Sequence, residues 1–136
     1  MNNGRFAISL HILTLLYKSK GEVLSSDYIA GSININPVLV RKEITQLRKA
    51  GYVDSKEGKN GGCFLIKAAK EINLADVFKS VYQEQLLSFA KNAPNPQCPV
   101  GKVMNTHLST LYADVEQAML AKLSESSLFT FCEQFD

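Results

Sequence analysis

Cysteine is scarce in this sequence, and tryptophan is absent. The three cysteines, Cys63, Cys98 and Cys132, are far apart along the chain and odd in number. Small secreted proteins that depend on disulfide bonds usually carry an even number of cysteines. The pattern therefore excludes a disulfide framework, and no closely spaced set of His and Cys residues predicts a metal site.

Long hydrophobic runs are also missing. The apolar run near the N-terminus, from Phe6 to Tyr17, is too short to span a bilayer. It lacks the basic start and the small-residue cleavage site of a signal peptide. We therefore predict a core helix of a cytoplasmic protein that makes no membrane contact.

Signatures of catalysis are missing as well. There is no nucleophile elbow and no pair of carboxylates in a recognisable setting. The segment EGKNGGC contains glycines and a lysine, but it lacks the spacing and the Ser or Thr of a P-loop. The chain is predicted not to be an enzyme.

Charge is present but unevenly distributed. Residues 1–70 carry eleven Lys and Arg against five Asp and Glu, a net charge of +6, whereas residues 71–136 carry four against eight, a net charge of −4. A basic first half suggests a polyanionic partner for that half. The alternative is that these charges form ordinary solvated surface.

Capping residues predict three helices in the N-terminal half. An apolar helix is expected over residues 4–18, and Ser25 or Ser26 caps a short second helix. Asn36 caps a third helix that begins at Pro37, where the missing N–H costs nothing. The predicted core stripe of this third helix consists of Val40, Ile44 and Leu47.

A β-hairpin is predicted after Gly51, which ends the third helix. Residues 52–56 and 63–67 form two short alternating segments, and the Asn-Gly pair between them favours the positive φ angles of a tight hairpin. Three helices followed by a hairpin are the order of a winged helix-turn-helix. We therefore expect a mainly α fold with a small β hairpin, whose DNA-binding domain covers residues 1–82.

The C-terminal part is predicted to hold a long helix. Residues 83–97 are rich in proline and asparagine and are expected to form a loop. A helix from about Pro99 to Leu123 would be ~37 Å long, which is more than the small domain is expected to cover. We therefore assign residues 98–136 to a dimerisation helix and a C-terminal tail, and predict a homodimer. The alternative is a helix that lies across its own domain. The predicted dimer seam consists of Met104, Leu108, Leu111, Val115, Ala118 and Met119.

The third helix and the hairpin are predicted to bind double-stranded DNA. Arg41 is placed to reach a guanine edge, and Asn36 and Val38 lie at the helix start, where base edges or a thymine methyl are within reach. The lysines of the helix and hairpin are expected to contact phosphates. The complete predicted set is Asn36, Val38, Arg41, Lys42, Thr45, Lys49, Lys56, Lys59 and Asn60.

Four segments carry a family resemblance. GRFAISLHILTLL, INPVLVRKEITQLRKAGYV, the GKNGG turn and EINLADVFKSV together resemble the Rrf2 family of bacterial winged-helix transcription regulators, over nearly the whole chain. The resemblance implies a homodimer that packs its long C-terminal helices together and regulates promoters through palindromic sites. It also places base contacts at Asn36, Val38 and Arg41 and the wing at Lys56 to Gly62.

Two positions depart from the family pattern. Glu57 stands where the wing often holds an arginine for the minor groove, and Cys63 stands where an aromatic residue often follows the glycines. Some family members hold an iron-sulfur cluster with three closely spaced cysteines before the long helix. This sequence offers Cys98 alone there, in a CPVG segment that resembles a subgroup of small Gram-positive regulators with a single cysteine, so we predict no cofactor.

Two interpretations of Cys98 remain. As the cap of the helix that begins at Pro99, its sulfur would lie at the positive end of the helix dipole, at the base of the dimer helix, and act as a thiol sensor. Alternatively, it is a small buried residue that anchors the loop. Cys63 and Cys132 are expected to be packing residues, and His11 a structural histidine.

The predicted function is a homodimeric, sequence-specific DNA-binding transcriptional regulator, a repressor that responds to thiol oxidation at Cys98. One alternative is a regulator driven by a small molecule held between the wing domain and the dimer helices, in the loop from Gln83 to Gln97, although nothing in the loop identifies this effector. The other is a winged-helix module that contacts proteins and does not bind DNA.

Overall fold

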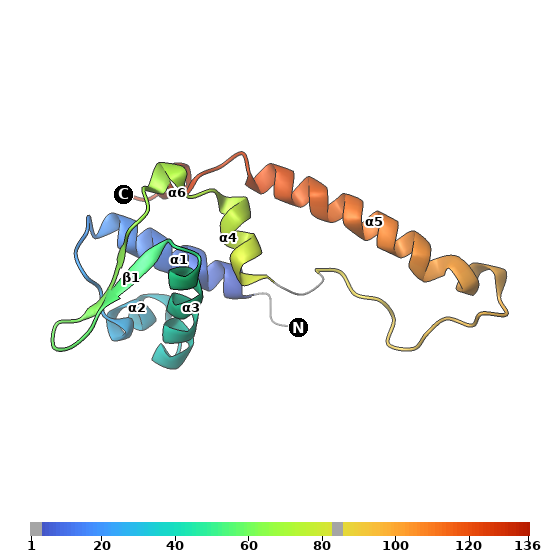
Figure 1. The fold of residues 1–136 in the computed structure, drawn as a ribbon, viewed down its shortest axis with the longest axis horizontal. Helices are drawn as coiled ribbons and strands as arrows, with labels where there is room; N and C mark the ends of the chain where they lie inside the picture. Colours follow the sequence, from blue (N-terminus) through green and yellow to red (C-terminus); the bar gives the residue numbers. More distant parts are fainter. Residues whose placement is uncertain (1–3, 83–85) are drawn as a thin grey trace.

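The computed structural model describes residues 4–82 and 86–136 and is mainly helical, with one two-stranded hairpin. Helices α1, α2, α3 and α4 and the hairpin are grouped together, and α5 extends from this group as a long arm (Figure 1). This is the expected mainly α fold with a small β hairpin. The elements in chain order are α1 (Gly4–Lys18), α2 (Ser26–Ile33), α3 (Pro37–Lys49), β1 (Val53–Lys56), β2 (Gly62–Leu65), η1 (Ala69–Glu71), α4 (Leu74–Val81), α5 (Pro99–Leu123) and α6 (Leu128–Cys132).

Local capping explains where the short helices begin. Ser25 Oγ accepts a hydrogen bond from the backbone N–H of Tyr28 at the start of α2 (3.1 Å). Asn36 Oδ1 accepts from the N–H of Val38 at the start of α3 (2.8 Å). Both caps satisfy N–H groups that have no partner within the helix, as the sequence predicted.

Helix α1 lies at the centre of the core. Its side chains Ile12, Leu13 and Leu16 are fully buried, and it packs against α2, α3, α4, α6 and β2. The predicted stripe of α3 is buried as expected, and it consists of Val40, Ile44 and Leu47. Burial of these apolar surfaces is the main source of stability, at roughly 25 cal/mol per Å² removed from water.

The wing is held to the core by a close backbone contact. Strands β1 and β2 are antiparallel, and Leu24 pairs with Cys63 on the outer edge of β2 through hydrogen bonds of 3.0 and 2.8 Å. Gly62 has a φ of +157°, and a Cβ there would lie 2.1 Å from the carbonyl oxygen of Leu24. Only glycine therefore fits at this position.

The loop of the wing is wider than a two-residue turn. The strands pair up to Lys56 and Gly62, which leaves residues 57–61 as the connection. Positive φ angles occur at Gly58 (90°) and Asn60 (65°), the second of which the Asn-Gly pair predicted. Gly61 has no positive φ, but a Cβ on it would lie 2.3 Å from the carbonyl oxygen of Lys56.

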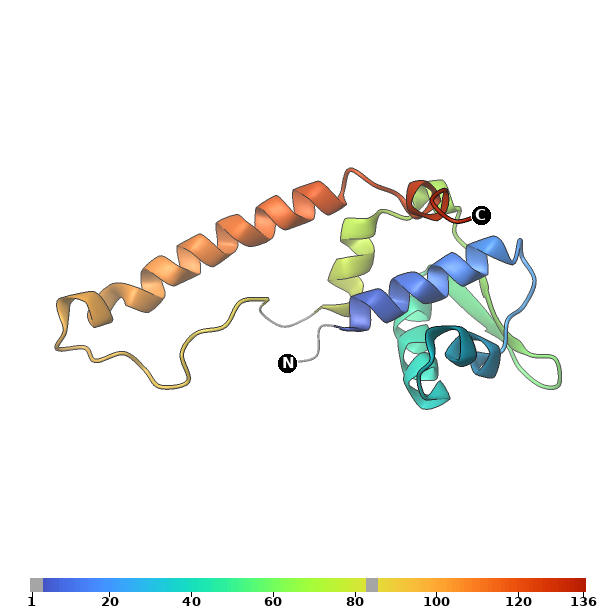
Figure 2. The same cartoon turned by 180° about the vertical axis from the view of Figure 1, so that it is seen from behind.

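The chain returns to the core after the long arm. Helix α5 spans the predicted residues, and α6 then packs against α1 and η1, with Leu128 and Cys132 fully buried (Figure 2). The N–H of Leu128 donates to the carbonyl of Ile72 (2.8 Å), which fixes this return. Sequence analysis treated these residues only as a tail, and α6 was not predicted. Within residues 4–82 and 86–136, no helix is both long enough and apolar enough to cross a membrane.

Candidate nucleic-acid interface

The outward face of α3 is basic and exposed. Burial of one stripe leaves the opposite face in solvent, and the apolar Val38 at the helix start is 61% exposed. The predicted residues on this face are all exposed, and they are Asn36, Val38, Arg41, Lys42, Thr45 and Lys49. The side chains with which a helix could read a major groove are thus presented by packing of the rest of α3 against the core.

Hydrogen bonds within α3 leave these side chains with different numbers of free donor groups. Asn36 Oδ1 is occupied by the helix cap, and Thr45 Oγ1 donates to the carbonyl oxygen of Arg41 (3.0 Å). The side chain of Arg41 has no such internal partner within the described part of the chain. Its guanidinium therefore offers more donor groups for base edges than either neighbour.

A groove of about 390 Å³ separates α3 from the wing. Arg41, Thr45 and Arg48 line one side, and Lys56 lines the other. Arg48 was not among the predicted residues, although its position two turns after Arg41 is the signal that places it on the same face. Two acidic residues, Asp27 and Glu57, also line the groove, so its charge is mixed.

The wing adds exposed basic and amide groups at its tip. Lys56, Lys59 and Asn60 are all exposed, as predicted. Across residues 4–82 and 86–136, the salt bridges found are Arg5–Glu43 and Lys122–Glu125, so the cations of α3 and the wing take part in no salt bridge within these residues. Such a surface favours a polyanion.

An ion pair beneath this face connects α1 to α3. Arg5 donates from Nε to Glu43 Oε2 (2.9 Å) and from Nη2 to Glu43 Oε1 (3.3 Å). The Glu43 side chain is only 5% exposed. The pair was not predicted from the sequence, and it fixes α3 on α1 from the side away from the exposed basic face.

Helix α5 presents an apolar stripe that the described residues leave largely exposed. None of its residues is buried, and the predicted seam residues Met104, Leu111 and Val115 are 39%, 55% and 42% exposed. Leu108 and Met119 are half-buried, and Ala118 is exposed. The alternative in which α5 lies across its own domain is wrong for this chain, because the helix extends away from α1–α4 (Figure 1).

Cys98 caps α5 as predicted, but at a different place in the molecule. Its Sγ accepts a hydrogen bond from the N–H of Gly101 (3.4 Å), and the backbone N–H groups of Gly101 and Val100 lower the pKa of the thiol. The side chain is exposed, so the interpretation as a buried anchor is wrong. The cysteine lies at the outer end of the arm and not at its base, because α5 runs from its tip back towards the core (Figure 1).

The other two cysteines are core residues. Cys63 and Cys132 are buried, and burial raises the pKa of both thiols, that of Cys63 to about 11. His11 Nε2 lies 3.0 Å from Ser32 Oγ and connects α1 to α2, as expected for a structural histidine.

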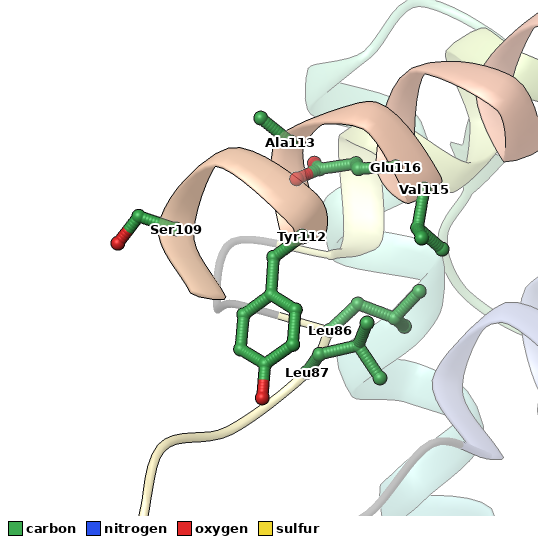
Figure 3. A pocket seen from close by; sticks show the side chains of 7 residues that line it. All are labelled: Leu86, Leu87, Ser109, Tyr112, Ala113, Val115 and Glu116. Atoms are coloured by element: carbon green, nitrogen blue, oxygen red, sulfur yellow. The ribbon is translucent and has the colours of Figure 1, made fainter. Parts of the chain in front are cut away.

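The loop before α5 lies along the arm. Tyr112 Oη donates to the carbonyl of Ser88 (2.7 Å), and the ring of Tyr112 packs against that of Phe89 at 5.3 Å. Leu86 and Leu87 approach the same face of α5, where they line a cavity of about 100 Å³ (Figure 3). This is below the range of about 300–1,000 Å³ usual for small-molecule sites. Of the predicted effector loop, residues 83–85 lie outside the described residues.

The fold and this face define a class of protein, the winged helix-turn-helix transcription regulators. The sequence of residues 2–134 matches the model of the Rrf2 family, which is described as an iron-dependent transcriptional regulator. The chain belongs to this family. Its members are transcriptional regulators and not enzymes, in agreement with the sequence analysis.

Known relatives match most of the length of this chain. The chain is 39% identical over 128 residues to YwnA of Bacillus subtilis, named an HTH-type transcriptional regulator, and the match covers 94% of each chain. It is 33% identical over 114 residues to the transcriptional regulator NsrR of Bacillus licheniformis, covering 79% of each. A solved structure of a transcriptional regulator from Lactobacillus plantarum superposes with a TM-score of 0.81 at 25% identity, covering 92% of this chain and 85% of the other.

The iron named in the family description does not fit the donors of this chain. An iron-sulfur cluster is usually held by four thiolates or by a mixture of thiolates and imidazoles. Among the described residues, no three His, Cys, Asp or Glu side chains are grouped as metal ligands. Cys98 lies at the outer end of α5, whereas Cys63 and Cys132 are buried elsewhere in the core.

Proposed function

We propose that the protein is a homodimer that binds a palindromic operator in double-stranded DNA and represses transcription in the cytoplasm. The observation that carries this proposal is the exposed cationic face of α3 and the wing, whose Lys and Arg side chains form no salt bridge in the described part of the chain. Membership of the Rrf2 family supports DNA as the polyanion.

Sequence discrimination is assigned to the start and middle of α3. Arg41 would donate two hydrogen bonds to a guanine edge, worth about 1–3 kcal/mol against other bases. Val38, exposed and apolar, suits a thymine methyl, and the amide N–H₂ of Asn36 suits a base acceptor. Affinity without discrimination is assigned to phosphate contacts of Lys42, Thr45, Lys49, Lys56, Lys59 and Asn60.

The second copy is expected to cover the apolar stripe of α5. Two such helices packed along their seams would remove Met104, Leu111 and Val115 from water and fix the separation of the two α3 helices. That separation must match about one turn of DNA, which is why a palindromic site is expected. The outer end of each arm, with Cys98, then lies towards the partner subunit.

Oxidation of Cys98 is the proposed signal. Its thiolate would attack one oxygen of a peroxide, so that an S–O bond forms and the O–O bond breaks. The sulfur is oxidised to a sulfenic acid, the peroxide is reduced, and the released hydroxide or alkoxide takes a proton from solvent to give water or an alcohol. The sulfur then loses its negative charge, and it becomes a weaker acceptor for the N–H of Gly101. The first turn of α5 loses its cap, and the dimer loses the helix spacing that DNA binding requires.

Selection of a binding site from random duplexes by the purified protein tests the proposal. We expect one palindromic sequence to be enriched, and its binding to weaken steeply as salt is raised. A protein-contact module would show no selective binding even at low salt. Repeating the titration with peroxide should release the wild-type protein but not Cys98→Ser, and a promoter with the site should be more active when the gene is deleted.

A further inference from the structure

A groove of about 390 Å³ lies between α1 and the C-terminal segment, away from the DNA face. One wall is a single face of α1, at helical spacings of three and four residues, and the other is formed by α6 and the residues after it. Neither the predicted DNA contacts nor the predicted dimer seam includes any residue of this groove. Its volume is within the range of about 300–1,000 Å³ that is usual for small-molecule sites.

The lining is mainly apolar, with one cation at its end. Leu10 and Leu15 line the α1 side, and the rings of Phe131 and Phe135 form a tilted pair with centroids 5.4 Å apart on the other side. Lys18 Nζ donates to the carbonyl of Phe135 (2.6 Å), which holds the ammonium group beside these rings. An ammonium has three donors, so two remain for a ligand.

The hydroxyl of Thr14 does not add a free polar group to the floor, because it donates to the carbonyl of Leu10 (2.7 Å). Asp136, an acidic residue, also lines the groove. The described residues contain no salt bridge between Asp136 and Lys18. Lys18 is therefore not held in an ion pair with this residue, although the two charges have opposite effects on an anionic ligand.

We propose that this groove binds a small organic anion that consists of an aromatic or aliphatic body and one carboxylate. The body would pack on Leu10, Leu15 and the two phenylalanine rings, and the carboxylate would accept hydrogen bonds from Lys18. A second protein chain fits less well, because nine residues line the groove and a stable protein interface uses about 20–30 residues on each side.

The groove lies next to elements that connect to both the proposed dimer helix and the proposed DNA-binding helix. One wall follows directly after α5, the proposed dimer helix, and the other wall is α1, which holds α3 through Arg5 and Glu43. A bound molecule would thus bias the angle between the arm and α3, and DNA would in turn change the affinity for the molecule. Only this regulatory consequence rests on the proposed function, whereas binding in the groove does not.

Titration followed by amide NMR of the full chain tests the binding directly. The probes are 3-phenylpropionate, the matched alcohol 3-phenylpropan-1-ol and the matched cation 3-phenylpropylamine. We expect the carboxylate to shift amides of α1 and α6 and to bind more tightly than the alcohol, with the amine weakest. Lys18→Met should weaken carboxylate binding about two- to five-fold, and Asp136→Asn should strengthen it by a similar factor, as expected for one exposed ion pair each. Neither change should affect the alcohol.

Filling the groove provides a second test. Ala7 is exposed and lines the groove, so Ala7→Trp should occupy it and abolish all three titrations. Ala93→Trp, at an exposed loop position outside the groove, is the matched control.

The proposal is overturned if the shifts fall on α5, if Ala7→Trp binds as well as wild type, or if the amine binds as tightly as the carboxylate. Binding that is detected only after the dimer is broken would also overturn it, because the second copy would then occupy the groove. Loss of DNA binding with retained probe shifts would contradict the proposed function alone.

Discussion

Arg41 is the side chain on which base discrimination should depend most, because the side chains of Asn36 and Thr45 are partly occupied by hydrogen bonds within α3. Replacing Arg41 with Ala should cost about 1–3 kcal/mol at the selected site and relax the preference at one base pair of each half-site. Competition binding against operators changed at single positions measures this.

Lys42→Ala is the matched control for that experiment. Lys42 is exposed on the neighbouring position of α3. A phosphate contact should weaken binding to all duplexes about equally and reduce the slope of log affinity against log salt by about 1. If the two variants gave the same pattern, the division into base and phosphate contacts would be wrong.

The three thiols should differ in reactivity as pH is raised. The N–H groups of Gly101 and Val100 lower the pKa of Cys98, whereas burial raises the pKa of Cys63 to about 11 and raises that of Cys132. Since the thiolate is the reactive form, alkylation of Cys98 should rise at a lower pH than that of a free thiol, whose pKa is about 8.5.

Mass spectrometry of protein treated with iodoacetamide across pH 6–9 resolves the three sites. Cys98 should be labelled first, and Cys63 should remain unlabelled until the fold opens. In denaturant all three should react alike, which controls for neighbouring sequence. Labelling of Cys98 that followed the profile of the denatured chain would remove the physical basis for a sensor at this position.

At the scale of elements, the partly buried pair of Arg5 and Glu43 should stabilise the contact between α1 and α3. Arg5→Met leaves a carboxylate that is 5% exposed without its partner, which should lower the free energy of unfolding by about 1–3 kcal/mol. Glu43→Gln keeps a hydrogen-bonding side chain of similar shape and should cost less. Urea unfolding of both variants and of the double variant measures the coupling, and additive effects would show that the pair is not coupled.

Elements with local causes were predictable from sequence. Asn36 and Pro37 fix the start of α3, and Cys98 and Pro99 fix the start of α5, because a cap acts on N–H groups only two or three residues away. The outward face of α3 followed from the spacing of Val40, Ile44 and Leu47, so the exposure of the candidate DNA residues was predictable as well.

Elements that depend on distant partners were not predictable. Helix α6 has five residues and a local cap at Ser127, but its place in the core depends on the hydrogen bond from Leu128 to Ile72, which no local pattern reveals. Arg5 and Glu43 are 38 positions apart. When the sequence alone is considered, Glu43 therefore resembles an ordinary surface charge. The position of Cys98 at the outer end of the arm depends on the path of the loop before α5, which its composition leaves open.

For the whole molecule, the arrangement of α5 has a consequence for assembly. The arm leaves the core at α4 and returns at α6, so both of its chain connections lead back to one domain (Figure 2). Its apolar stripe nevertheless stays largely exposed among the described residues, with Leu111 55% exposed. A second copy is the cover that a symmetric dimer provides, since a two-fold axis pairs the same stripe with itself.

Leu111 tests this assembly because it is 55% exposed at the middle of the stripe. Leu111→Asp would place a carboxylate opposite its own symmetry mate in the proposed interface, and burial of such a charge is costly. We expect a monomer in sedimentation analysis, with an unchanged fold of α1–α4. Thr110→Asp, which adds the same charge at the adjacent exposed position, should remain a dimer if that position faces solvent.

Because a palindrome is bound by two linked domains, the monomer should lose at least about 100-fold in affinity for the full operator. Its affinity for a single half-site should change little. A Leu111→Asp protein that stayed dimeric would place the interface elsewhere, and a monomer that kept full operator affinity would show that DNA binding does not need the dimer.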